Sequence, residues 1–344
     1  MRNGLNRFVG SAVAESQSIA LPPLEERPLV TFALFAYNQE KYIREAVEGA
    51  FAQTYEPLEI ILSDDCSTDR TFEIMREMAA GYRGPHRIVL NKNSTNQGLC
   101  RHVNTVFRLA KADVIVMAAG DDISLSGRVA HTVEIFHRHP DVLSVSMEYR
   151  SIDERGLLGP RGKSHFHDGK FNLRDLLERV RMPIHGSTRA YRKHLFEIFG
   201  PLHDSCKIED ATLRLRALLA GCIYHSDVQG ILYRVHSASL SASIKKESQL
   251  SVYRQYLLDL KRAVSLSMFG PDQSAQIKFV LRSMIARGLI LSRHHQARYR
   301  LLSFLSSVLP SARFSGREKI YLFYEILSCS PLAPVVKIIR KGFR

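Results

Sequence analysis

Strand-like apolar runs alternate with amphipathic stretches through the first 120 residues of the chain. The apolar runs cover residues 29–35, 58–62, 86–91 and 114–119. Runs of this kind, with little polar alternation, are typical of strands buried on both faces of a parallel sheet. The stretches between them, residues 39–53, 71–78 and 99–110, repeat apolar residues at helical spacing, and Asn38 is the expected N-cap of the first helix. The pattern therefore predicts a doubly wound, mostly parallel α/β sheet.

The pattern becomes more varied after residue 125. Residues 142–149 and 231–235 favour strands, residues 184–191 an extended segment, and residues 125–139, 172–180, 192–199 and 211–220 helices. From about residue 245 the apolar residues keep helical spacing only, which predicts an all-helical C-terminal region. The small and polar residues 1–27 predict a loose N-terminal leader.

Polar side chains follow three of the predicted strands at the point where each strand ends. They are Asn38, the acidic stretch of residues 64–69, and the adjacent pair Asp121 and Asp122. The carboxyl ends of parallel strands share one edge of a sheet, where open α/β sheets bind their ligands. Carboxylates there suit a Mg²⁺ or Mn²⁺ ion that also contacts a substrate phosphate, although the pair could equally be loop residues that cap the next helix. No G-x-G-x-x-G or P-loop pattern follows the first strand, which argues against a dinucleotide or Walker-type site.

The chain is basic, and the excess of positive charge is confined to its C-terminal third. The formal net charge is +14; residues 241–344 carry 18 Lys and Arg against 5 Asp and Glu, and the preceding residues carry 30 against 29. The balanced front part argues against a nucleic-acid-binding body, whereas the basic tail indicates an anionic membrane surface as partner. Five widely spaced Cys without a C-x-x-C pattern favour a reducing compartment. With no secretory signal pattern and no apolar run of membrane-spanning length, we expect a cytoplasmic protein, peripheral on the inner face of the cell membrane.

Six short motifs occur in a fixed order between residues 29 and 236, each where the pattern predicts a strand end or a helix start. They are Ala36-Tyr37-Asn38-Gln39-Glu40, residues 63–69, Asn96-Gln97-Gly98 with Arg101 and Asn104, Gly120-Asp121-Asp122-Ile123 with Gly127-Arg128, Glu209-Asp210, and Tyr233-Arg234-Val235-His236. Together they resemble the motif series of the inverting family-2 glycosyltransferases, which have the GT-A fold.

The resemblance implies a GT-A catalytic domain, Rossmann-like with a mostly parallel sheet, over residues 28–240. Residues 28–125 would form its nucleotide-binding half and residues 126–240 its acceptor half, followed by a basic helical extension over residues 241–344. It implies transfer of a sugar from a nucleoside-diphosphate sugar to an acceptor hydroxyl, with inversion of the anomeric centre. The residues that it assigns to the nucleotide sugar are Ala36, Tyr37, Asn38, Glu40, Asp64, Asp65, Gly98, Arg101, Gly120 and Arg234.

One position departs from the family pattern. The first acid of the metal motif falls at Ala119, which cannot ligate a metal. By the resemblance, Asp121 would hold the divalent cation, Mg²⁺ or Mn²⁺, that bridges the two donor phosphates. Asp122 or His236 would assist it, although His236 could also be a hydrogen-bonded loop residue.

The resemblance assigns the acceptor chemistry to an acidic pair. Asp210, with Glu209 beside it, would take the proton of the acceptor hydroxyl. From the residues alone, both are equally explained as acids favoured at the N-terminus of a helix. Since the resemblance covers both halves of the predicted domain, we expect Asp210 to act as a general base.

The expected partners are a nucleoside-diphosphate sugar and a glycan or lipid-linked acceptor, as in cell-surface polysaccharide synthesis. Ala119 motivates one alternative, a catalytically inactive sugar-nucleotide-binding or scaffold protein, and the intact pair Glu209-Asp210 argues against it. The net charge motivates a second alternative, a nucleic-acid-binding protein. The charge split and the lack of aromatics interleaved with the basic cluster argue against that alternative, so no nucleic acid is expected.

Overall fold

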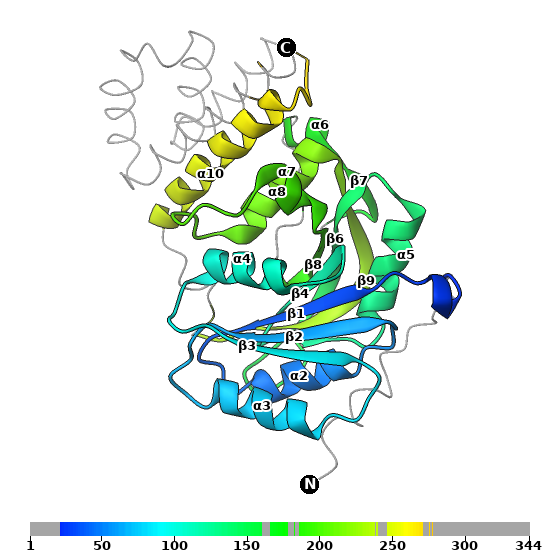
Figure 1. The fold of residues 1–344 in the computed structure, drawn as a ribbon, viewed down its shortest axis with the longest axis vertical. Helices are drawn as coiled ribbons and strands as arrows, with labels where there is room; N and C mark the ends of the chain where they lie inside the picture. Colours follow the sequence, from blue (N-terminus) through cyan, green and yellow to red (C-terminus); the bar gives the residue numbers. More distant parts are fainter. Residues whose placement is uncertain are drawn as a thin grey trace.

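The computed structural model describes residues 21–159, 166–177, 182, 186–237, 239, 246–270, 275 and 277. Within them, nine strands form one sheet in the order β3-β2-β1-β4-β8-β6-β9-β5, with β7 paired to β9. The leader predicted over residues 1–27 is described only from residue 21, where a short 3-10 helix, η1 (Leu24–Glu26), precedes the sheet. The predicted α/β architecture is confirmed (Figure 1).

The first half of the sheet follows the sequence pattern closely. Its strands are β1 (Val30–Ala36), β2 (Leu58–Asp64), β3 (Arg87–Lys92) and β4 (Val114–Ala119), and each pairing among them is parallel. The helices between them are α2 (Ile43–Phe51), α3 (Thr71–Gly81) and α4 (Leu99–Leu109). Three strand–helix units in succession therefore give the predicted parallel sheet.

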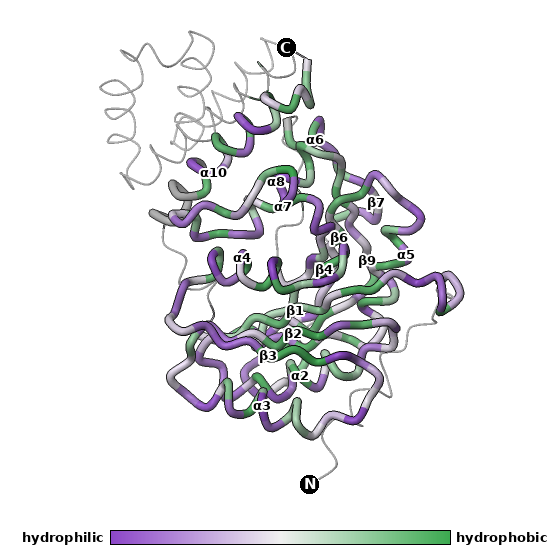
Figure 2. The backbone as a smooth tube through the Cα atoms, viewed as in Figure 1, coloured by the Kyte–Doolittle hydropathy of each residue, from purple (hydrophilic) through white to green (hydrophobic). Residues whose placement is uncertain are grey.

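Alternate residues of β1 enter two separate apolar cores. Phe32 and Leu34 pack with α2, α3 and α5 on one face, whereas Ala33 and Phe35 pack with α4 on the other. All seven residues of β1 are buried, because side chains on a strand point to opposite faces and both faces here carry helices. Figure 1 shows α2 and α3 on one side of the strands and α4 on the other, and Figure 2 shows hydrophobic residues concentrated in the strands.

The second half of the sheet mixes strand directions. Its elements are β5 (Ile123–Ser124), α5 (Arg128–Arg138), β6 (Val142–Ile152), β7 (Gly169–Phe171), α6 (Leu173–Leu177), η2 (Gly186–Thr188), β8 (Arg189–Arg192), α7 (His194–Phe199), α8 (Glu209–Ala220) and β9 (Cys222–Arg234). β8 runs antiparallel to both β4 and β6, while β6 and β9 are parallel. The described part of the segment predicted as extended over residues 184–191 begins with the helical turn η2, and β9 is much longer than the strand predicted at residues 231–235.

Helix α10 (Lys246–Ser265) belongs to the segment that the sequence assigned to a separate basic extension. Its residues Val252, Tyr256, Leu260 and Ala263 pack into the same apolar core as α4 and α8 (Figure 1). Among the described residues, α10 therefore packs on helices of the domain predicted over residues 28–240. Among the described residues, no helix is both long enough and apolar enough to cross a membrane. The rest of the predicted extension, residues 278–344, lies outside the described residues.

Candidate active site

Three strands end level with one another and bring the predicted site residues to one edge of the sheet. Ala36, the last residue of β1, pairs with Asp64, the last residue of β2. Phe35 of β1 pairs with Ala119, the last residue of β4. The loops that follow, with Asn38, Asp65 and Asp121, therefore share the carboxyl edge of the parallel half. The predicted convergence of these strand ends is confirmed.

The loop after β1 and the loop after β2 are joined by hydrogen bonds between side chains and backbone. The backbone N–H groups of Asn38, Gln39 and Glu40 donate to Ser67 Oγ, Thr71 Oγ1 and Asp69 Oδ2, at 2.8, 2.7 and 3.0 Å. In return, Asn38 Oδ1 accepts from the N–H of Thr68 and Glu40 Oε2 from the N–H of Arg70. We call this array the loop zipper.

The loop zipper corrects one sequence prediction. Asn38 was expected to cap the first helix, but α2 begins at Ile43, with Tyr42 as its N-cap. Asn38 instead adopts a φ of +52°, a conformation that Asn tolerates better than most residues. Its amide side chain serves the neighbouring loop. The resemblance assigned both Asn38 and Glu40 to the nucleotide sugar. In the structure, a side-chain oxygen of each accepts a hydrogen bond from the neighbouring loop.

The carboxylates of Asp64 and Asp65, at the end of β2, hold the loops at this edge through hydrogen bonds. Asp64 is fully buried and accepts from the N–H of Ser67 at 2.8 Å. Asp65 accepts from Asn93 Nδ2 and from the N–H groups of Gln97 and Gly98, at 2.8, 2.9 and 2.8 Å. The carboxylate of Asp65 therefore fixes the loop that leads into α4, where Gly98 has a φ of +75°.

Two side chains predicted for the nucleotide sugar are accessible at this edge. The ring of Tyr37 is 43% exposed, directly after the buried Ala36. The guanidinium of Arg101 is half exposed and pairs with Asp204 at 2.7 Å, which joins α4 to the segment before α8. An exposed ring and an exposed cation can stack on and contact an incoming base or phosphate.

The turn after β4 begins with a glycine in crowded surroundings. A Cβ at Gly120 would lie 2.4 Å from Gln39 Oε1 and 3.1 Å from the Cβ of Ala36. The N–H of Gly120 donates to the carbonyl of Phe35 at 2.8 Å, so the turn stays attached to β1. The Asp121–Asp122 turn therefore lies close against the loop that follows β1.

The two carboxylates of this turn have different surroundings. Asp121 Oδ2 lies 3.0 Å from His236 Nε2, with side chains 13% and 5% exposed. Asp122 Oδ1 accepts from the N–H of Arg234 at 2.9 Å. Burial, reinforced by the charge of Asp121, raises the pKa of Asp122 to about 7. Asp121 is therefore the more accessible acid, and Asp122 joins the turn to the end of β9.

The donor set at this turn fits a divalent cation that shares its coordination with a substrate. Within the described part of the chain, no three His, Cys, Asp or Glu side chains gather closely enough to hold a metal by themselves. Mg²⁺ sites with nucleotides need only one or two carboxylates, because phosphates and water complete the shell. Asp121 supplies such a carboxylate, oriented by His236, whose buried Nδ1 has no partner among the described residues.

The second acidic pair lies in the first turn of α8. The sequence predicted Glu209 and Asp210 ahead of this helix, whereas the helix begins at Glu209 itself. Glu209 is buried, and burial followed by the charge of Asp210 raises its pKa to about 8. Asp210 is half-buried. Its Oδ1 accepts from the N–H of Ala211 at 2.5 Å. At neutral pH, Glu209 therefore keeps its proton and adds no second negative charge beside Asp210.

A short segment connects the two acidic clusters. A Cβ at Gly186 would lie 2.6 Å from Glu209 Oε1 and 3.2 Å from the Cβ of Asp210. The next residue, Ser187, accepts through its carbonyl from Arg128 Nη2 at 2.7 Å. Arg128 is buried, and its charge favours the ionised form of Asp122. One turn of η2 therefore contacts both the α8 pair and the residues that frame the Asp121–Asp122 turn.

Sequence reasoning placed Arg128 in a motif but did not foresee its role as a buried hydrogen-bond donor. Arg128 donates to Ser124 Oγ and to the carbonyls of Met117 and Ser187, and it thereby ties α5, β4 and η2 together. The sequence offered no signal for this role, because the same helix also carries His131, His137 and Arg138.

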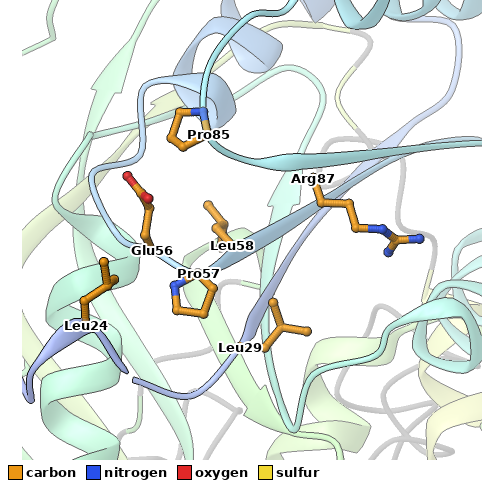
Figure 3. Close-up of a pocket in the computed structure, with 7 residues that line it drawn as sticks. All are labelled: Leu24, Leu29, Glu56, Pro57, Leu58, Pro85 and Arg87. Carbon is orange, nitrogen blue, oxygen red and sulfur yellow. The ribbon is translucent and has the colours of Figure 1, made fainter. Parts of the chain in front are cut away.

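A cavity of about 310 Å³ lies away from this edge. Leu29, Pro57 and Arg87 line it at the opposite, amino ends of β1, β2 and β3 (Figure 3). Its walls are mainly aliphatic and proline side chains, and Arg87 pairs with the buried carboxylate of Glu59. The cavity contains one acid, Glu56, and none of the acids predicted for the site at the carboxyl edge.

Comparison with known proteins gives a consistent result for the first 200 residues. The family model described as Glycosyl transferase family 2 matches residues 31–199. The putative glycosyltransferase EpsE of Bacillus subtilis is 36% identical over 136 residues, which are 39% of this chain and 48% of EpsE. The aligned stretch thus spans less than half the length of that relative.

Solved structures share the fold over most of the chain. The crystal structure of Staphylococcus aureus TarS 1-349 in complex with UDP-GlcNAc has a TM-score of 0.59 at 17% identity, covering 91% of this chain and 87% of that one. The mannosyltransferase PcManGT of Pyrobaculum calidifontis, in complex with GDP-Man and Mn²⁺, has a TM-score of 0.52 at 16% identity, covering 90% and 83%. At these identities the likeness establishes the GT-A fold, which the resemblance of the sequence motifs implied.

Proposed function

We propose that the protein belongs to glycosyl transferase family 2, whose family model matches residues 31–199, and that it transfers a sugar from a nucleoside-diphosphate sugar to an acceptor hydroxyl, with inversion. The acceptor is a glycan or a lipid-linked glycan of the cell surface. One geometric relation supports the proposal. The short helix η2 connects the two acidic clusters, because Gly186 lies against Glu209 and Asp210 and Ser187 binds Arg128 beside the Asp121–Asp122 turn.

The donor binds at the edge of the parallel half. Tyr37 offers an exposed ring, and Gly98 opens α4, whose N-terminus carries the positive end of the helix dipole. Asp65 and the loop zipper preorganise these groups, since their oxygens bind backbone N–H groups of the same loops. The TarS complex with UDP-GlcNAc and the PcManGT complex with GDP-Man support a nucleotide sugar as the ligand of this fold.

Asp121, oriented by His236, would hold a Mg²⁺ or Mn²⁺ ion. When bound, the ion would supply positive charge that stabilises the departing diphosphate. PcManGT, with the same fold, was solved with Mn²⁺ and its donor. Because Ala119 replaces the first acid of the family motif, the chain depends on Asp121 for this contact.

Asp210 acts as the general base of the transfer. The acceptor hydroxyl attacks the anomeric carbon from the face opposite the diphosphate, and its proton passes to the carboxylate of Asp210 as the new carbon–oxygen bond forms. The bond between the anomeric carbon and the diphosphate oxygen breaks, and its electrons leave with the diphosphate. Burial raises the pKa of Glu209 to about 8, so this neighbour adds little negative charge beside Asp210 at pH 7.

The membrane partner follows from charge alone. Residues 241–344 carry the excess of Lys and Arg, and clustered cations bind anionic leaflets. We include an inner-membrane surface and a cytoplasmic location in the proposal on that basis. A liposome co-sedimentation assay with and without anionic lipid tests it, since loss of binding in neutral vesicles is expected.

The first experiment measures nucleoside-diphosphate release from a panel of sugar nucleotides, with membrane extract as acceptor, and with Mg²⁺, Mn²⁺ or EDTA. For Asp210→Asn we expect a rate at least about a hundredfold lower, because the base is lost while the shape is kept. Asp113→Asn is the matched control, since Asp113 precedes β4 at the opposite edge and is exposed. Its rate should equal that of the wild type.

Two other outcomes would contradict the proposal. Donor binding without release from any sugar nucleotide would favour the inactive scaffold that the substitution at Ala119 suggests. Equal rates for wild type and Asp210→Asn would show that Asp210 is not the base.

A further inference from the structure

Arg234 is among the most deeply buried side chains of the protein, although it lies at the end of β9 beside the acidic turn. It is 1% exposed. Its Nε donates to the carbonyl of Asp121 at 2.9 Å, Nη1 to the carbonyl of Asp153 at 3.1 Å, and Nη2 to Glu45 Oε2 at 2.5 Å. All three guanidinium nitrogens are therefore engaged inside the protein.

Through these contacts Arg234 joins three segments near the Asp121–Asp122 turn. Asp121 follows β4, Asp153 follows β6 and Glu45 lies in α2, so the segments are far apart in sequence. The guanidinium also lies over the ring of Tyr42, 4.8 Å from its centroid. The same ring contacts the imidazole of His236 at a centroid distance of 4.8 Å. Arg234 is thus connected to His236 through Tyr42 as well as through the two intervening peptide bonds.

Arg234 also contacts the acidic turn through its backbone. Its N–H binds Asp122 Oδ1 at 2.9 Å, while Asp121 Oδ2 faces His236 at 3.0 Å. With side chain and backbone together, one residue fixes the carbonyl of Asp121 and the carboxylate of Asp122. The direction of the Asp121 carboxylate is thereby set before any ligand arrives.

The resemblance assigned Arg234 to the nucleotide sugar, and the geometry points to another role. We propose that Arg234 is a positioning residue that holds Asp121 and His236 in the arrangement that captures the divalent cation. This rests on the proposed function, and it matters more in this chain because Ala119 leaves Asp121 without the usual companion acid. The guanidinium acts through the turn and does not contact the donor phosphates.

The direct test is Mn²⁺ binding, measured by electron paramagnetic resonance of free Mn²⁺ in the presence of UDP or GDP. For Arg234→Lys we expect Mn²⁺ affinity to fall about 10- to 100-fold, the range for residues that orient metal ligands. At saturating Mn²⁺, the KM for the sugar nucleotide should stay within about threefold of wild type. Arg216→Lys, at an equally buried arginine on α8, is the control for lost stability. It should lower Tm without changing Mn²⁺ affinity.

Glu45→Gln gives a second test that does not disturb the buried arginine itself. Glu45 is half exposed, so the variant should fold, and it removes the charged partner of Arg234 Nη2. We expect a smaller loss of Mn²⁺ affinity in the same direction. Glu48→Gln, on the same helix, is the matched control and should bind Mn²⁺ like the wild type.

Three results would overturn the proposal. Unchanged Mn²⁺ affinity in Arg234→Lys, together with a lower Tm, would reduce Arg234 to a structural residue. A raised KM at saturating Mn²⁺ with normal Mn²⁺ affinity would make it a donor ligand. A wild type that binds no Mn²⁺ with either diphosphate would remove the basis of the inference. Normal Mn²⁺ binding without any turnover would count against the proposed function alone and would leave the role of Arg234 intact.

Discussion

The two halves of the sheet are held together by different chemistry. In the parallel half, the strands β1, β2 and β4 bury apolar side chains on both faces, whereas the edge strand β3 has no buried residue. In the mixed half, the largest fully buried side chains are four arginines, Arg128, Arg189, Arg216 and Arg234. Among the described residues before β5, no arginine is buried. The parallel half is therefore stabilised by apolar contacts that recur along its strands. In the mixed half, buried arginines also contribute, at places where short segments meet.

The difference follows from where backbone carbonyls lack a regular partner. In a continuous parallel ladder the carbonyls are satisfied by neighbouring strands. In the mixed half, short segments such as η2 and the loop before α8 expose carbonyls inside the protein. Arg128 binds the carbonyls of Met117 and Ser187, and Arg216 binds that of Gly200. A guanidinium with five donors satisfies several such groups at once.

The largest loss of stability is expected when a buried arginine is removed from the mixed half. Arg216 of α8 pairs with Asp259 of α10 at 2.9 Å, with side chains 0% and 1% exposed. Arg216→Met should lower the free energy of unfolding by about 3–5 kcal/mol, because Asp259 is left buried and unpaired. Urea unfolding followed by circular dichroism measures the effect.

Two further variants sharpen this prediction. Arg70→Met breaks the Arg70–Glu77 pair of the parallel half, whose side chains are 69% and 55% exposed. It should cost less than about 1 kcal/mol. Adding Asp259→Leu to Arg216→Met should restore much of the loss, since the unpaired charge is gone. Equal costs for Arg216→Met and Arg70→Met would refute the contrast between the two halves.

The stability of the mixed half is also expected to depend on pH. The pKa of Glu209 is raised to about 8 by burial, against about 4.3 in an unfolded chain. Between these values the folded state binds more protons than the unfolded state, so stability falls as pH rises, by up to about 1.4 kcal/mol per pH unit. Glu209→Gln should flatten the decline of Tm between pH 5 and pH 8. Asp122, whose pKa is raised to about 7, should leave a residual slope. An unchanged profile would mean that Glu209 ionises freely in the folded protein.

A last test concerns the parallel half at its edge. Gly98 has a φ of +75°, and a Cβ there would meet no atom within 4 Å. Gly98→Ala should therefore cost about 1–2 kcal/mol through backbone strain alone. Gly127→Ala is the matched control, because Gly127 has an ordinary φ of −83° and equally open surroundings. A cost of Gly98→Ala no larger than that of the control would show that the loop adapts.

The same contrast explains how far the sequence could predict the molecule. The apolar runs of β1 and β4 gave their positions to within a residue, because burial on both faces removes polar residues from a strand. Asp64 and Asp121 were recognisable because they directly follow such runs. The length of β9 was missed, since its buried, half-buried and exposed residues follow no simple alternation.

Contacts across the chain were beyond sequence reasoning. Nothing near Arg234 in the sequence indicates that its guanidinium meets Glu45, 189 positions away. The hydrogen bonds of Asn38 to Ser67 and Thr68 depend on the loop approach that the paired ends of β1 and β2 create. Such partners depend on tertiary arrangement, and local propensity carries no record of them.

The loop zipper has a consequence for engineering the donor preference of this enzyme class. Because Asn38 and Glu40 on one loop interlock with residues 67–70 on the other, neither loop is an independent module. A chimaera that imports one loop from a relative would bring mismatched donors and acceptors to the other. Recombination breakpoints placed between residues 36 and 71 would separate co-adapted partners, whereas exchanging the whole interval would keep them together.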